Sequence, residues 1–218
     1  MQRDIITGHL WFEQATSKNH IPTPRCDLCE SVHSLHHLNL TTMLSQSMQD
    51  ALNKQVLLEA QSSQSYLAMA SWADIQPGLK GVTQFFFKHS DEERMHMLKL
   101  ITYINERGGF AVIPPLEQPT LTFVSLKQAF EELFRGEVNV SESINDLVDI
   151  SLKEKDYATH NFLQWYVNEQ LEEERLAREC NDKLEMIGDD KSGLYLFDRD
   201  IVMMGGPGHG QRRQGKGR

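Results

Sequence analysis

One glutamate lies where the buried face of a helix is expected. In the segment FFFKHSDEERMHMLKLI, residues 85–101, a helical rotation of about 100° per residue puts Glu93 in the same sector as Phe86 and Leu100. A buried carboxylate without a partner is costly, so Glu93 must be neutralised, paired or bound to a metal ion. His96 follows on the same side of the helix and completes a Glu-x-x-His motif.

The same feature recurs on three further amphipathic patterns. Glu59, Glu137 and Glu173 each share a helical sector with apolar residues, and Glu169 lies beside Glu173. Any one of them could be the polar edge of an apolar stripe, and Glu-x-x-His alone is a weak motif. Four anions in one dry site, however, would repel one another unless cations neutralised them. Carboxylates with a single imidazole suit iron or manganese, so the pattern predicts a dinuclear centre bridged by Glu93.

Four long amphipathic patterns must position these side chains. Pro77 and Gly78 separate the first pattern from the second, and Gly108 and Gly109 end the second. A short fifth pattern, KSGLYLFDRDIV, follows the fourth. The four long patterns cover about residues 46–74, 80–107, 125–155 and 156–187, with Asp156 as the expected N-cap of the last.

The second and third patterns are joined by a long connection, GGFAVIPPLEQPTLTFV. A helix of about 27 residues is roughly 40 Å long. A connection of about 17 residues reaches roughly 55 Å when extended, so it can run the full length of a helix bundle. The sequence therefore predicts an all-α four-helix bundle with one long crossover connection and a short fifth C-terminal helix.

The composition limits the partners of the protein. The chain has 218 residues and a formal net charge of −9, and its acidic residues are concentrated between the two ends. An acidic body suits cations and argues against nucleic acid as the main partner. No segment approaches the roughly 20 apolar residues of a membrane span, and the N-terminus lacks the apolar core of a signal peptide. We therefore expect a cytoplasmic protein without a membrane partner.

The two ends of the chain fall outside the helical patterns. Residues 1–42 lack sustained periodicity and are expected to be a disordered extension, and residues 205–218 a flexible, glycine-rich basic tail. The charges of the tail could contact nucleic acid but also fit a solvated end. Within the extension, Cys26 and Cys29 form a Cys-x-x-Cys pair. Zinc could bind this pair, but one such pair is a weak signal. The imidazoles available to complete such a site are His33, His36 and His37.

Residues 43–204 closely resemble the bacterial non-haem ferritins. The stretches QSSQSYLAM, HSDEERMHM, NFLQWYVNEQLEEERL and GLYLFDRD carry the resemblance, which begins at Met43. It implies a ferritin-like fold and a ferroxidase centre that binds non-haem iron. The resemblance assigns the first iron to Glu59, Glu93 and His96, with Gln170 nearby; the second to Glu93, Glu137 and Glu173; and a third to Glu92, Glu169, Glu172 and Glu173.

The resemblance also implies two aromatic residues beside this centre. Tyr66 would adjoin the irons and Trp165 would be a further neighbour, where both could supply electrons during oxidation. Core packing accounts for these two residue types equally well, so the sequence leaves the choice open.

Two departures separate this chain from the bacterioferritins. Those proteins carry a second Glu-x-x-His on the last long helix, where this chain has Gln170 and Glu173. The second iron would therefore lack an imidazole and be held more loosely, as suits iron that passes through. Bacterioferritins also place a haem-binding methionine directly after the bridging glutamate. This chain has Arg94 there, so no haem is expected.

The resemblance implies iron storage and detoxification. Fe²⁺ would be oxidised by O₂ or H₂O₂ and deposited as ferric mineral inside a homo-oligomeric shell of 24 subunits, in which the fifth helix surrounds the fourfold axes. A rubrerythrin-like diiron oxidase or peroxide-detoxifying protein is the alternative, against which the missing second histidine and the fifth helix argue. A metal-free helical scaffold is least favoured, because four buried glutamates would lack partners.

Overall fold

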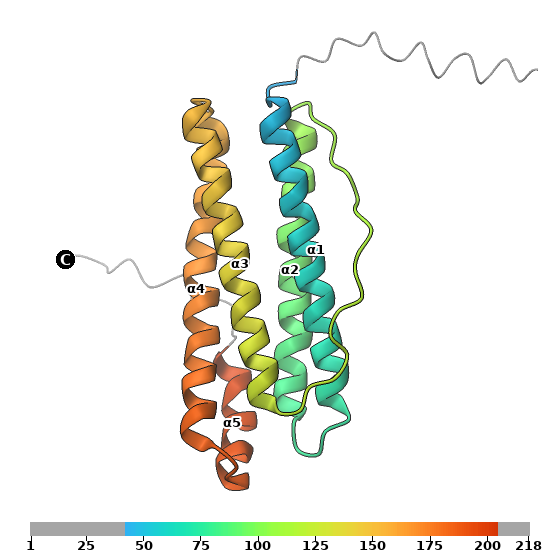
Figure 1. The fold of residues 1–218 in the computed structure, drawn as a ribbon, viewed down its shortest axis with the longest axis vertical. Coiled ribbons are helices and arrows are strands. Elements are labelled where there is room, and N and C mark those ends of the chain that lie inside the picture. The colour runs from blue at the N-terminus through green and yellow to red at the C-terminus, as the bar shows by residue number, and fades with distance from the viewer. Residues whose placement is uncertain (1–41, 205–218) are drawn as a thin grey trace, which may run out of the picture. The chain divides into compact units, whose positions relative to one another are not determined.

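The computed structural model describes residues 42–204, which form five helices and no strand. The predicted four-helix bundle with a long crossover and a short fifth helix is confirmed (Figure 1). None of these helices is long and apolar enough to cross a membrane. The helices are α1 (Gln46–Asp74), α2 (Lys80–Glu106), α3 (Leu126–Lys153), α4 (Tyr157–Ile187) and α5 (Lys191–Met204). The residues considered for zinc, Cys26, Cys29, His33, His36 and His37, and the basic segment 205–218 lie outside the described residues.

Capping side chains begin three of the long helices. Ser45, Ser125 and Asp156 each accept a hydrogen bond from the backbone N–H three residues further on, at 3.0 to 3.1 Å. These bonds satisfy N–H groups that have no partner within the helix. The expected N-cap role of Asp156 is thereby confirmed. Gly78 and Gly108, with φ angles of 85° and 75°, form the turns on either side of α2.

The crossover between α2 and α3 is held against α1 by side-chain amides. Asn53 and Gln61 each accept a hydrogen bond from a crossover N–H and donate one to a crossover carbonyl, at 2.8 to 3.1 Å. These bonds give an extended segment the partners that a sheet would otherwise supply. The crossover therefore runs along the bundle, so that α3 starts at the end opposite to the one where α2 stops (Figure 1).

A belt of buried polar side chains divides the apolar core into two clusters. One cluster includes Phe86 and Phe130, and the other includes Leu52 and Ile144. On each long helix most of these polar residues lie between the segments that contribute to the two clusters. Burial of this many polar groups costs free energy unless they are paired or bind an ion. The belt therefore marks the candidate functional region. Its members are Gln55, Glu59, Ser63, His89, Ser90, Glu93, His96, Glu137, Gln170 and Glu173.

A glycine at the start of α2 allows α5 to pack closely. A Cβ atom at Gly81 would lie 1.8 Å from the carbonyl oxygen of Asp198. The side chain of Asp198 also accepts a hydrogen bond from the backbone N–H of Val82 at 2.9 Å. Phe197 and Ile201, on the buried side of α5, join the core cluster that includes Phe86. The absence of a side chain at position 81 therefore helps to fix α5 on the bundle.

Gly81→Ala is expected to displace α5 and to lower the free energy of unfolding by about 2 kcal/mol or more, because backbone atoms must move apart. Gly136→Ala is the matched control. No atom lies within 4 Å of a Cβ there, so alanine should stabilise α3 by about 1 kcal/mol. Thermal unfolding of the two variants measures the difference. A midpoint for Gly81→Ala at or above that of the wild type would contradict the close contact.

Candidate metal centre

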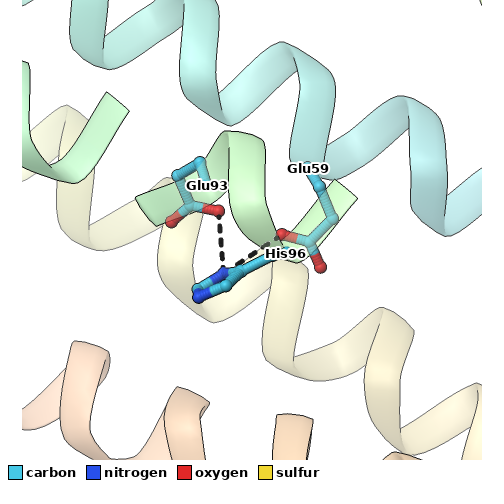
Figure 2. A group of neighbouring side chains, drawn as sticks. All are labelled: Glu59, Glu93 and His96. Carbon is cyan, nitrogen blue, oxygen red and sulfur yellow. Dashed lines mark ion pairs between the residues drawn. The ribbon is translucent and has the colours of Figure 1, made fainter. Parts of the chain in front are cut away.

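Glu59 from α1 converges with Glu93 and His96 from α2 inside the polar belt (Figure 2). His96 Nδ1 lies 3.4 Å from Glu93 Oε2 and 3.7 Å from Glu59 Oε2. Ligand atoms of all three residues lie within 4.8 Å of one another, and none of these side chains is more than 6% exposed. Gln55 donates a hydrogen bond to Glu59 Oε1 at 2.8 Å, whereas Glu59 Oε2 has no hydrogen-bond partner. A buried carboxylate oxygen without a donor suits a cation.

Protons and hydrogen bonds balance these charges when no metal is bound. Burial alone would lower the pKa of His96, but the adjacent carboxylates of Glu59 and Glu93 outweigh it and raise the pKa to about 11. Burial, together with repulsion from Glu137, raises the pKa of Glu93 well above its usual range. A metal ion would displace these protons, so metal binding at this trio is coupled to proton release.

Two aromatic residues of α4 pack around His96. The hydroxyl of Tyr166 donates a hydrogen bond to the backbone carbonyl of His96 at 2.8 Å. Trp165 meets the imidazole edge-on, with ring centroids 5.2 Å apart. Trp165 is not a core residue, because it is 38% exposed. The Lys99 ammonium lies 3.5 Å from the centre of its ring. Trp165 therefore lies between His96 and solvent.

Glu137 from α3 is held by two neutral hydrogen-bond donors. The hydroxyl of Tyr66 donates to Glu137 Oε1 at 2.7 Å, and the amide of Gln170 donates to Glu137 Oε2 at 3.3 Å. Burial raises the pKa of Glu137, although both of these hydrogen bonds oppose the rise. Tyr66 and Gln170 thus orient this carboxylate. Among the described residues Glu137 belongs to no group of three ligands close enough to share one ion.

Tyr66→Phe is expected to remove the donor to Glu137 Oε1. Loss of a hydrogen bond to a buried carboxylate should lower the free energy of unfolding of the metal-free protein by about 1.5–3 kcal/mol. Tyr157→Phe is the control, because Tyr157 is 67% exposed at the start of α4. Thermal unfolding of both metal-free variants measures the effect. Equal midpoints for the two would mean that the Tyr66 hydroxyl does not stabilise Glu137.

Glu173 from α4 faces a histidine that the sequence analysis did not single out. His89 Nδ1 lies 3.5 Å from Glu173 Oε2 and 3.4 Å from Glu92 Oε2. Burial, aided by repulsion from neighbouring carboxylates, raises the pKa of Glu173 to about 8, while burial lowers the pKa of His89 to about 3. The signal was available in the sequence. His89 precedes Glu93 by about one helical turn and His96 by about two, so the three share a helix face.

The remaining carboxylates that the resemblance assigns to a third iron are Glu169 and Glu172. Two groups of three ligands come within 4.8 Å among the described residues, and Glu169 and Glu172 belong to neither. Glu172 pairs with Arg175 at 3.4 Å. Glu92 and Glu169 line a pocket of about 660 Å³ between α2 and α4, which also contacts His96. His96 is the member of the buried trio that lines this pocket.

A four-helix bundle that points glutamates and a Glu-x-x-His motif into its core defines the class of ferritin-like carboxylate metalloproteins. The same class follows from comparison with known families. Residues 49–187 match the family model of the ferritin-like domain named Ferritin. The chain therefore belongs to the ferritin family.

Relatives and solved structures agree with this family. A protein of Haemophilus influenzae, described as a probable bacterial non-heme ferritin-like protein, is 45% identical over 159 residues, which cover 73% of this chain and 96% of the relative. The bacterial non-heme ferritin of Campylobacter jejuni is 43% identical over 73% of this chain and 95% of its own. An open pore ferritin from the archaeon Archaeoglobus fulgidus is 41% identical, with a TM-score of 0.71 over 73% of this chain and 98% of that structure.

Proposed function

We propose that this protein oxidises Fe²⁺ at a dinuclear carboxylate site within each subunit and stores the product as ferric mineral. Iron is substrate and cargo in this reaction. One Fe²⁺ would bind Glu59, Glu93 and His96, and a second would bind Glu93, Glu137 and Glu173, with Gln170 and Tyr66 beside them. The trio formed by Glu59, Glu93 and His96 is the observation that carries the proposal, because its buried donors lie at distances that fit one ion.

Oxygen-rich coordination explains why iron fits this centre. Carboxylates with one imidazole are hard donors, and no cysteine lies among the polar side chains of the belt. Each Fe²⁺ gives one electron, so O₂ takes two electrons and two protons and becomes H₂O₂. When H₂O₂ is the oxidant, it takes two electrons and two protons and becomes two water molecules. The protein contributes a fixed spacing of the metals and a site of low dielectric.

The donor set favours passage of iron over its retention. A second Glu-x-x-His on α4 would place a carboxylate at position 170 and an imidazole at position 173. Here α4 instead offers the carboxylate of Glu173 and the amide of Gln170, which donates hydrogen bonds to Glu137. A neutral amide is a weaker ligand for iron than the carboxylate of that motif, and the second position lacks an imidazole. We therefore propose that Fe³⁺ formed at the second position leaves the site for the mineral.

Storage requires an assembly with an interior, and we propose a shell of 24 subunits. Solved structures that are similar to this chain carry the name ferritin. Side chains of α5 support a role in subunit contacts, because Tyr195, Leu196, Val202 and Met203 are large, apolar and exposed in the single chain. Deletion of residues 189–218 is expected to convert a large particle into smaller species on size exclusion. An intact particle after this deletion would contradict the role of α5.

Iron loading tests the proposed function. The protein is mixed aerobically with Fe²⁺ in large excess over its chains and separated by size exclusion with in-line iron detection. Co-elution of most of the iron with one large, uniform particle is the expected result. Iron that stops at the few ions per chain that protein ligands can hold, on a small oligomer, would instead identify a diiron oxidase. Iron that does not co-elute with the protein would contradict both functions.

A further inference from the structure

We propose that Tyr103 is a one-electron donor to the metal centre, connected to His96 by a line of aromatic rings and to the carboxylate of Asp156 by a hydrogen-bonded path for its proton. The resemblance to bacterial ferritins points to Tyr66 and Trp165 as sources of electrons and does not include Tyr103. The use of this electron in iron oxidation rests on the proposed function. The transfer of an electron from Tyr103 through the rings does not, and it can be measured without iron.

The line of rings lies between α2 and α4, and each ring contacts the next. Tyr103 stacks on Phe162, with ring centroids 3.8 Å apart and planes 9° from parallel. Phe162 packs against Tyr166 at 5.6 Å. Tyr166 in turn lies 4.8 Å from Trp165 and 6.2 Å from His96, measured between ring centroids. Electrons pass readily between rings in contact, so Tyr103 is coupled to a metal ligand two helical turns away on α2.

The hydroxyl group of Tyr103 also has a path for its proton. Burial would raise the pKa of Asp156, but hydrogen bonds from the side chain and backbone of Thr159 outweigh it and lower the pKa. The ionised carboxylate accepts a hydrogen bond from Thr159 Oγ1, which engages the only hydrogen of that hydroxyl. Tyr103 must therefore be the donor in its 2.8 Å contact with Thr159 Oγ1. A phenol that loses an electron becomes a strong acid, so its proton moves to Thr159 while Thr159 passes its own to Asp156.

The other oxidisable rings of this line lack such a combination. The hydroxyl of Tyr166 donates to the backbone carbonyl of His96, which does not take up a proton. The ring centre of Trp165 lies 3.5 Å from the Lys99 ammonium, which opposes the positive charge of an oxidised indole. Of these three residues Tyr103 is therefore the one on which a radical is most stable, and oxidation of the line ends there.

An additional electron is needed when the centre holds one iron and meets H₂O₂. Reduction of H₂O₂ to water takes two electrons, whereas one Fe²⁺ supplies one and would leave a hydroxyl radical. With Tyr103 the reaction balances: H₂O₂, Fe²⁺, the Tyr103 phenol and two protons taken up at the centre give Fe³⁺, two water molecules, a Tyr103 phenoxyl radical and a proton on Asp156. The O–H bond of Tyr103 is the bond that breaks. The next Fe²⁺ returns the electron and becomes Fe³⁺, and the proton goes back to the tyrosyl oxygen.

Rapid freezing and EPR spectroscopy test this role. Metal-free protein is loaded anaerobically with a single Fe²⁺ per chain, mixed with H₂O₂ and frozen. We expect a tyrosyl radical in the wild type and its loss in Tyr103→Phe, which keeps the ring stack but has no phenol. A spin trap should detect more hydroxyl radical in this variant. Tyr157→Phe is the matched control and should keep the tyrosyl radical, because Tyr157 is 67% exposed at the start of α4 and lies outside the line of rings.

Two further positions test the proton path and the electron path separately. Thr159 is fully buried, and Thr159→Val keeps its size but removes the hydroxyl, so radical formation should slow by about tenfold. Thr159→Ser should preserve it. Phe162→Leu removes the ring between Tyr103 and Tyr166 and should lower the tyrosyl signal although the phenol remains. A merely structural role of Thr159 or Phe162 would change the midpoint of thermal unfolding and leave the radical as it is.

Pulse radiolysis tests the electron path without iron. Azide radicals oxidise exposed tryptophan in the metal-free protein, and Trp165 should then take an electron from Tyr103. Tyrosyl absorbance is expected to grow as tryptophanyl absorbance decays. This growth should be lost in Tyr103→Phe and in Trp165→Phe and retained in Tyr157→Phe.

The outcomes distinguish this proposal from the proposed function. In a protein that oxidises Fe²⁺, absence of a tyrosyl radical after H₂O₂, or an equal radical in wild type and Tyr103→Phe, would overturn the role of Tyr103 and leave the proposed function in place. Transfer to Tyr103 in pulse radiolysis of a protein that neither oxidises nor stores iron would support the electron path and contradict the ferritin activity. Absence of both the transfer and the oxidation would contradict both proposals.

Discussion

Replacement of Glu93 by glutamine is expected to lower the initial rate of Fe²⁺ oxidation by roughly 100-fold or more. Glu93 is the proposed bridge between two ions, so its loss affects both metals at once, and about 3 kcal/mol of lost transition-state stabilisation corresponds to this factor. Glutamine keeps the size of a side chain that is buried beside His96 at 3.4 Å. The fold should therefore remain intact. Stopped-flow absorbance of ferric products under air measures the initial rate.

The control for this prediction is Glu142→Gln. Glu142 is an exposed residue of α3, outside both groups of metal ligands, so its replacement should leave the initial rate unchanged. Circular dichroism and size exclusion confirm that both variants fold and assemble. Glu93→Ala should also abolish rapid oxidation. An initial rate close to that of the wild type in folded Glu93→Gln would show that the buried centre is not where iron is oxidised.

The metal-free protein is expected to lose stability as the pH rises from about 6.5 to 8.5. The pKa of Glu173 rises from 4.5 unfolded to about 8 folded, and that of His96 from 6.5 to about 11. A group whose pKa is higher in the folded state contributes stability at low pH and loses it as the pH rises through the folded pKa. For Glu173 alone the loss between pH 6.5 and 8.5 is on the order of 2 kcal/mol per subunit. Glu93 and Glu137 act in the same direction because their pKa values are also raised.

The pKa of one buried group shifts in the opposite direction on folding, but this group titrates in a lower pH range. The pKa of His89 falls from 6.5 to about 3 on folding, so its contribution to stability grows between pH 3 and 6.5 and is constant above. Above pH 6.5 the groups with raised pKa values therefore determine the slope.

Thermal unfolding of metal-free protein across this range, with and without Zn²⁺, measures the effect. Zinc should raise the midpoint more at pH 8.5 than at pH 6.5, because bound metal replaces the protons that the cluster loses. Glu173→Gln serves as the control variant, and its midpoint should depend less on pH. A midpoint of the metal-free wild type that rises or stays constant from pH 6.5 to 8.5 would contradict the charge balance described for the cluster.

The fold was predictable because its signals are local. Each long helix carries its own apolar period and its own breaker, such as Pro77 and Gly78 before α2, and Asp156 caps α4 where a side-chain acceptor was expected. The crossover could be predicted from the length of the connection alone, because about 17 extended residues can span a helix of about 27 residues. Close packing of α5 was not foreseen. It depends on the close approach of Gly81 to the Asp198 carbonyl, and these residues lie far apart in the sequence.

The sequence by itself determined which helices carry inward-facing carboxylates, because a helix of 3.6 residues per turn assigns every residue to a face. It also determined that α4 has Glu173 at the position where a second Glu-x-x-His would have placed an imidazole. Only the tertiary structure decided how these ligands group. It placed His89 between Glu92 and Glu173 and turned Glu172 towards Arg175. The reason is physical: distances between side chains on different helices depend on how the helices pack, and a shift of about 1 Å decides whether two donors can share one ion.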